Sequence, residues 1–206
     1  MATLSAAVLL ALVTLGLSFG GDLRLRSDSN RRITHTSFGG NVDVARALRG
    51  AKIRSFGGEV RFGSTQGTVE VTSFGGNIQI DALGGDARLT SFGGEVDVSL
   101  ADLPTATVRQ IVLRSFGGDV HLNLPNDFGA TIEVHATCRP GREDRCGVRG
   151  SDLDFHETRH VSRTLFRKRD VLDATAKVGN GRNHVIVRLE ESRIVVRRIG
   201  HGAGKS

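Results

Sequence analysis

The chain has 206 residues with a formal net charge of +6, and it contains no Trp, no Tyr and a single Met. This length allows one domain with a sizeable core. Glycine accounts for 27 residues and proline for only 3, which disfavours a disordered chain and favours repeated β-turns. The charge is uneven, because residues 1–138 hold 12 Lys/Arg and 13 Asp/Glu (−1), whereas residues 139–206 hold 16 and 9 (+7). The basic part suits acidic polymers or plain solvation, but it lacks the interleaved aromatic residues typical of a specific nucleic-acid site.

The N-terminal residues 1–19 form an apolar segment in which residues 3–19 carry no charge. Its length suits a signal peptide or a membrane anchor better than a complete membrane span. No Lys or Arg precedes the apolar run, and the best small-residue cleavage site falls on the first copy of a repeat. Two interpretations therefore stay open: a cleaved or anchoring segment, or the first coil of the fold.

The tetrapeptide Ser-Phe-Gly-Gly occurs six times, with successive spacings of 19, 18, 18, 18 and 24 residues. The copies begin at Ser18, Ser37, Ser55, Ser73, Ser91 and Ser115. Alternating polar and apolar residues follow each copy, as in GNVDV and GEVRF, and weaker half-copies lie between the central ones. Strict alternation is typical of strands with one buried face, so each eighteen-residue repeat predicts two short strands joined by turns.

Identical strands at a fixed spacing indicate either a stacked solenoid or an antiparallel meander. The identity of the repeats favours the solenoid, because equivalent positions of successive coils stack at about 4.8 Å and like side chains then lie on like. We therefore predict an all-β fold, a β-solenoid similar to a single-stranded β-helix, with about 18 residues and two strands per coil over residues 20–138. One internal column that fills a corner of the core is expected from Phe38, Phe56, Phe74, Phe92 and Phe116.

The glycines of the repeat are predicted to be structural. A Gly-Gly pair can adopt positive φ and leaves room for close stacking of coils, while the serine can bond to the backbone of the turn. The second glycines of the five regular copies are Gly40, Gly58, Gly76, Gly94 and Gly118. Phosphate binding would require a helix after such a loop, and the sequence has a strand pattern there instead.

Beyond the repeats the pattern changes. The spacing of 24 predicts an extruded loop around Pro104, and residues 139–182 are interpreted as an irregular basic segment. Residues 183–199 contain two alternating strands that we expect to cap the stack, and residues 200–206 are expected to form a flexible tail.

Two motifs in the C-terminal part invite a chemical interpretation. Cys138 and Cys146 flank a turn-rich polar stretch, which favours a disulfide across a hairpin loop, with unpaired thiols as the alternative. The segment HETRH matches a pattern in which two His on one helix face bind zinc and the Glu activates water. The flanking sequence begins like a strand and no third ligand follows, so we expect a solvated polar segment, with His156 and His160 as the residues that a metal would use.

No Ser-His-Asp order, nucleophile elbow or phosphate-binding loop occurs in the sequence. We therefore expect neither an enzyme nor a cofactor.

The serial units resemble the adhesin-type β-strand repeat family, a bacterial domain of unknown function with Ser-x-Gly-Gly and Asp-x-Val-x-Val units. The segments HLNLPNDFGATIEVHATC and VGNGRNHVIVRLEESRIVVRR resemble the last two parts of that pattern, and the likeness covers roughly residues 18–198. It implies a β-repeat fold and supplies no catalytic residues. The chain departs from the pattern in its regular Phe and in Glu190-Glu191-Ser192, which replaces the usual Asn-Gly or Asp-Gly turn.

The expected function is that of a non-enzymatic, adhesin-like protein of the cell envelope or surface. It would present a rigid, repetitive β-surface to envelope glycans or to another protein, with membrane association through residues 1–19. One alternative is a cytoplasmic β-helical scaffold that polymerises end to end, and another is a zinc-dependent hydrolase acting through the HETRH motif.

Overall fold

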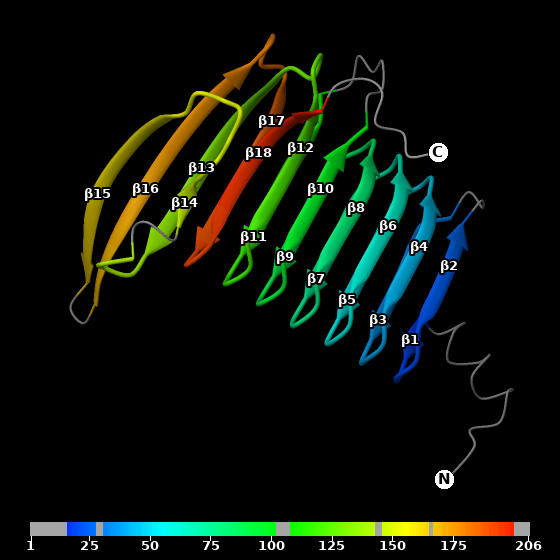
Figure 1. The fold of residues 1–206 in the computed structure, drawn as a ribbon. Helices are drawn as coiled ribbons and strands as arrows, with labels where there is room; N and C mark the ends of the chain where they lie inside the picture. Colours follow the sequence, from blue (N-terminus) through cyan, green and yellow to red (C-terminus); the bar gives the residue numbers. More distant parts are fainter. Residues whose placement is uncertain (1–15, 28–30, 102–107, 143–145, 165–166, 200–206) are drawn as a thin grey trace, which may run out of the picture.

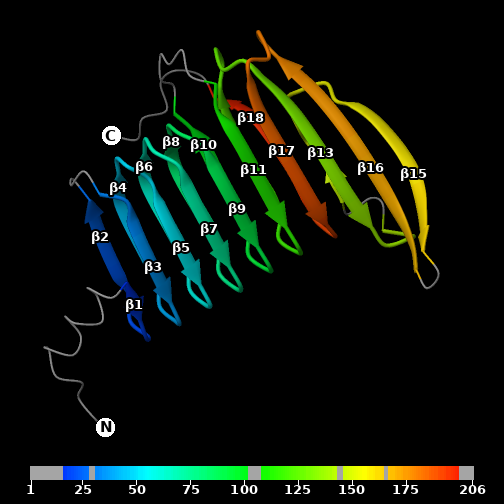
Figure 2. The same cartoon turned by 180° about the vertical axis from the view of Figure 1, so that it is seen from behind.

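Two stacked β-sheets form the structure of this chain, a computed structural model that describes residues 16–27, 31–101, 108–142, 146–164 and 167–199 (Figures 1 and 2). No helix occurs among these residues, and none of them therefore belongs to a helix long and apolar enough to cross a membrane. Residues 1–15, the loop around Pro104 and the tail 200–206 lie outside the described residues.

The ten-stranded sheet contains, in spatial order, β1 (Leu17–Ser18), β3 (Ile33–Ser37), β5 (Ala51–Ser55), β7 (Val69–Ser73), β9 (Ala87–Ser91), β11 (Gln110–Ser115), β17 (Asn183–Glu190), β13 (Ala130–Cys138), β16 (Arg167–Val178) and β15 (His156–Thr164). The eight-stranded sheet contains β14 (Gly147–Val148), β18 (Arg193–Ile199), β12 (Val120–Pro125), β10 (Val96–Leu100), β8 (Ile78–Leu83), β6 (Val60–Thr65), β4 (Val42–Ala47) and β2 (Leu23–Ser27).

From β1 to β12 the chain passes alternately between the two sheets. Each strand pairs in parallel with the strand two places later, so that Val42 lies beside Val60 and Val60 beside Ile78. The repeated tetrapeptide forms the turns from odd to even strands, visible as the row of loops along the lower edge in Figure 1. The predicted all-β class, with two parallel sheets built in repeat order, is confirmed in this part of the chain.

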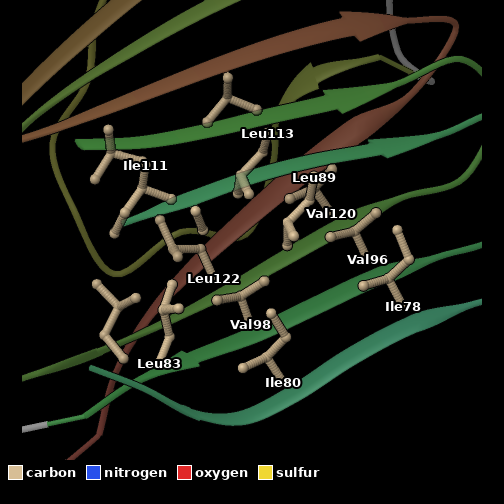
Figure 3. Packing of buried hydrophobic residues seen from close by; sticks show 14 of the residues in the cluster. Ile78, Ile80, Leu83, Leu89, Val96, Val98, Ile111, Leu113, Val120 and Leu122 are labelled. Atoms are coloured by element: carbon tan, nitrogen blue, oxygen red, sulfur yellow. The ribbon is translucent and has the colours of Figure 1, made fainter. Parts of the chain in front are cut away.

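The core is a single layer of apolar side chains between the two sheets. Alternate residues of each strand point inward, as Val60 and Phe62 do in β6, and both are fully buried. Figure 3 shows Leu89 from one sheet and Val96 and Val98 from the other filling the space between the ribbons. The alternation in the sequence therefore corresponds directly to burial.

Residues 139–182 are not irregular, as the sequence had suggested, because most of them form strands. The strands β16 and β15 are antiparallel to their neighbours and extend the ten-stranded sheet beyond β13. Strand β16 buries Leu172, Ala174, Ala176 and Val178, where alanine weakens the apolar signal. The edge strand β15 is exposed from His156 to Val161, so its sequence carries almost no strand pattern.

Residues 183–199 form the two strands that the alternation predicts, but these strands do not cap the stack. Strand β17 lies between β11 and β13, and β18 lies between β12 and β14. Both pair in parallel with their neighbours, so they continue the stack of coils. Although β17 comes after β13 in the sequence, it lies nearer to the repeats, because β13 pairs on the far side of β17.

The second glycine of each turn permits the close approach of successive coils. A Cβ on Gly76 would lie 1.7 Å from the carbonyl oxygen of Gly58, and one on Gly94 would lie 2.3 Å from that of Gly76. The backbone at Gly58 also has φ +77°, which favours glycine. By contrast, a Cβ on the first glycine, such as Gly75, would meet nothing within 4 Å. This close contact supports the structural role predicted for the second glycine.

We predict that Gly76→Ala lowers thermal stability while Gly75→Ala does not. The added methyl group at residue 76 meets backbone atoms that can move only if the coils separate, a form of overpacking that costs on the order of 1–3 kcal/mol. For a chain of this size that corresponds to a fall in Tm of roughly 2–12 °C. Thermal denaturation of both variants measures the difference, and equal Tm values would contradict the close contact between coils.

Candidate functional site: an exposed aromatic edge

The phenylalanines of the repeat form one stacked column along an edge of the molecule. Neighbouring ring centroids are 4.8–5.0 Å apart, with interplanar angles of 1–6°. The column contains Phe19, Phe38, Phe56, Phe74, Phe92 and Phe116. The predicted column of like residues is thus present. Leu17–Phe19 are part of the repeat structure, because β1 pairs with β3 and Phe19 stacks on Phe38.

The predicted position of this column inside the core is wrong. The six side chains are 41–61 % exposed, from Phe116 to Phe19. The reason lies in the alternation: in β7, Val69, Val71 and Ser73 point inward, so the next residue, Phe74, points outward. Serine, not phenylalanine, occupies the corner of the core.

A row of buried serines holds each turn from inside. The hydroxyl of Ser73 donates to the carbonyl oxygen of Gly76 at 2.7 Å, and the hydroxyl of Ser91 donates to that of Gly94 at 2.6 Å. Both side chains are fully buried, so these bonds satisfy polar groups that have no access to water. The predicted bond from serine to the turn backbone is confirmed.

Backbone bonds fix the spacing of the rings. The amide of Phe74 donates to the carbonyl oxygen of Ser55 at 2.9 Å, and the amide of Phe92 donates to that of Ser73 at 2.9 Å. The amides of Phe38, Phe56 and Phe116 make the equivalent bond to the serine of the preceding coil. The column therefore repeats at the spacing of the β-strands beneath it.

A polar row lies beside the column, on the side of the eight-stranded sheet. It contains Asp22, Asn41, Glu59, Asn77, Glu95 and Asp119. The side chain of Asn41 accepts a bond from the amide of Glu59 at 2.8 Å, and the side chain of Asn77 accepts one from the amide of Glu95 at 2.9 Å. We call the six rings and this polar row the aromatic edge.

The HETRH motif lies on a strand and not on a helix. In β15, His156 and His160 are four residues apart, which in a strand separates their backbones by about 13 Å. Zinc requires nitrogen ligands about 2 Å from the metal, so the two His cannot meet at one ion as they do on a helix face. Within the described ranges, no group of three or more His, Cys, Asp or Glu is arranged to hold a metal.

A second polar surface lies on the outer face of the ten-stranded sheet. Asp173 of β16 pairs with His135 of β13 at 2.6 Å and lies 3.6 Å from His160 of β15. A groove of about 520 Å³ runs beside this cluster and is lined by Glu133, Arg188 and neighbouring residues. Sequence spacing could not place these groups together, because β13 and β16 are joined by a long excursion that includes β14 and β15.

A disulfide joins Cys138 and Cys146. Cys138 ends β13 in the ten-stranded sheet, and Cys146 directly precedes β14 in the eight-stranded sheet. The bond therefore links the two sheets near the C-terminal end of the stack, which is more than the closed hairpin loop that the sequence predicted.

No protein-family model, curated protein or solved structure matches this chain. Its function is therefore argued from the surfaces described above, among which the aromatic edge is the longest regular feature.

Strand β3 of the ten-stranded sheet points one histidine, His35, into the core. His35 occupies the position that Ile53 has in the next coil, and its side chain is only 3 % exposed. Its Nε2 lies 3.0 Å from the hydroxyl oxygen of Ser18, and burial lowers the pKa of its imidazole below 6.5. Burial in the folded protein therefore disfavours the protonated form of this residue.

We predict that wild-type stability falls as the pH drops below about 6.5 and that His35→Ile reduces this loss. The unfolded chain binds a proton at residue 35 more readily than the folded chain does, so acid favours unfolding. Thermal denaturation at pH 7.5 and pH 5.0 measures the effect, with His156→Gln on the exposed strand β15 as the control. An unchanged pH dependence in His35→Ile would contradict this role.

Proposed function

We propose that this chain is a β-solenoid that acts as a non-enzymatic binding protein of the cell envelope or surface, and that the aromatic edge is its binding surface. The observation that carries the proposal is the column of six half-exposed rings at a constant spacing of 4.8–5.0 Å. Large contiguous apolar patches are uncommon on isolated soluble proteins and mark interaction sites.

The stack beneath the edge supports a role in presentation. Each ring after Phe19 follows a buried serine, and its backbone amide is bonded to the preceding coil, so the surface is preorganised. A preorganised surface loses little conformational entropy when it binds. The disulfide between Cys138 and Cys146 suits an oxidising compartment outside the cytoplasm. The resemblance to the adhesin-type repeat family points to the same role.

The end-to-end scaffold receives less support from the fold. Polymerisation of this kind needs an unprotected edge strand at each end of the stack. Strand β15, at one end of the ten-stranded sheet, is exposed and carries Glu157 and Arg159, and such charged edge strands disfavour edge-to-edge pairing.

We predict that the chain lies outside the cytoplasm and is retained there through its rings. A full chain with a C-terminal tag would be produced in its own cells, fractionated and exposed to external protease. We expect an envelope-associated, protease-accessible protein, and we expect Phe56→Ser/Phe74→Ser to be released into the soluble fraction. The control variant Val161→Ser removes an apolar side chain that is 48 % exposed but distant from the edge, and it should stay with the envelope.

A protein that external protease cannot reach and that fractionates with the cytosol would overturn the envelope assignment. Equal retention of the wild-type chain and the folded double-Phe variant would show that the aromatic edge is not the binding surface. Circular dichroism of the variants shows whether they are folded.

A further inference from the structure

We propose that the partner of the aromatic edge is a second copy of this chain, bound side by side with its column parallel and related by a two-fold axis along the stack. This inference rests on the proposed function, since it takes the edge to be a binding surface and names what covers it. Retention through the rings then acts through the pair, because it is paired chains that the envelope holds.

The arrangement of the rings restricts the kind of partner. Every ring between Phe19 and Phe116 has both faces covered by its neighbours at 4.8–5.0 Å, so the column presents the rims of its rings. A sugar or a nucleobase binds an aromatic side chain by stacking on a ring face. After Phe116, the equivalent position in the next coil is Glu190, which ends the apolar column. A long, narrow apolar strip that lacks free faces is best covered by another strip of the same length.

The exposed area is sufficient for a dimer. A phenylalanine side chain buries about 150–250 Å², and the six rings are 41–61 % exposed. Each copy therefore offers on the order of 500 Å² of aromatic surface, and two copies offer about 1,000 Å² before the flanking polar residues are counted. A specific interface needs about this total area.

The flanks of the column carry opposite charges in two of its coils, those of Phe56 and Phe116. The residue two positions before each ring lies on the ten-stranded side, and the residue three positions after it lies on the eight-stranded side. These pairs are Leu17 and Asp22, Thr36 and Asn41, Arg54 and Glu59, Thr72 and Asn77, Thr90 and Glu95, and Arg114 and Asp119. Each arginine thus shares its coil with a carboxylate across the column, and Thr36 and Thr72 each share theirs with an asparagine.

Two orientations of the dimer are possible, and they differ in which flanks they bring together. A two-fold axis along the stack sets the ten-stranded flank of one copy against the eight-stranded flank of the other at the same height. Arg54 then faces Glu59 of the partner subunit. An axis across the stack sets like flanks together in reverse order, so that Asp22 faces Asp119 of the partner subunit and no arginine meets a carboxylate. The parallel arrangement is therefore favoured, although Asp119 also binds Arg193 within its own chain.

The first test is the mass of the purified full chain in solution, measured by light scattering during size-exclusion chromatography. We expect twice 22.0 kDa for the wild-type protein and for Val161→Ser, and 22.0 kDa for the folded variant Phe56→Ser/Phe74→Ser. A monomeric wild-type chain would overturn the inference, and so would a dimer that survives loss of both rings.

The second test is the orientation. Gly93 lies in the turn beside Phe92, and a Cβ there meets nothing within 4 Å, so Gly93→Cys is tolerated by the fold. In the parallel dimer the two introduced thiols lie at the same height and form an intersubunit disulfide under mild oxidation. In an antiparallel dimer residue 93 lies opposite the coil of residue 39. Efficient crosslinking only in a mixture of Gly39→Cys and Gly93→Cys would therefore overturn the parallel arrangement.

The two proposals fail in different ways. If the chain is a monomer and its retention in the envelope still depends on the rings, the dimer is excluded and the binding role is retained. Ring-dependent binding of that monomer to phosphatidylcholine–phosphatidylglycerol vesicles would then name a lipid surface as the partner. Conversely, a ring-dependent dimer whose retention does not depend on the rings would sustain the dimer and sink the envelope-binding role.

Discussion

Close contact between the backbones of successive coils is the constraint on which the rest of the structure depends. At the second glycine of each turn from Gly40 onward no Cβ fits, because the carbonyl of the preceding coil already occupies that space. The coils can therefore lie at β-sheet spacing throughout, in the turns as well as in the strands. Side chains next to the glycines therefore repeat at the same distance from one coil to the next. Six phenylalanines stand there, so an aromatic column at 4.8–5.0 Å follows from the way the backbone packs.

Much of this architecture could be predicted from sequence, because period and alternation are local signals. The eighteen-residue repeat predicted two strands per coil, and the Gly-Gly pairs predicted the turns. The direction of the rings was missed, although the alternation through Val69, Val71 and Ser73 contains it. The hairpin of β15 and β16 could not be found in this way, since two of the four inward residues of β16 are alanine and its edge strand is polar. The interleaving of β17 between β11 and β13 depends on long-range pairing that no local pattern carries.

The aromatic edge, which runs along the stack, differs in chemistry from the strand at its end, β15. The end strand β15 is polar and exposed, and it carries the HETRH segment in an extended form in which the two His are far apart. The aromatic edge instead exposes a continuous apolar strip between a flank with arginine and a flank with carboxylates. A strip with these properties suits lateral association, and we propose that the chain acts by binding through this edge.

The most direct test of the parallel stack is a distance between spin labels on Thr34→Cys and Val112→Cys, measured by double electron–electron resonance in the otherwise oxidised chain. These residues occupy equivalent outward positions four coils apart, through Lys52, Glu70 and Arg88. Stacked coils advance by one strand spacing per repeat, so we expect a backbone separation of roughly 19 Å. An antiparallel meander would advance by two strands per repeat, and a separation near 38 Å would contradict the stack and with it the aromatic column.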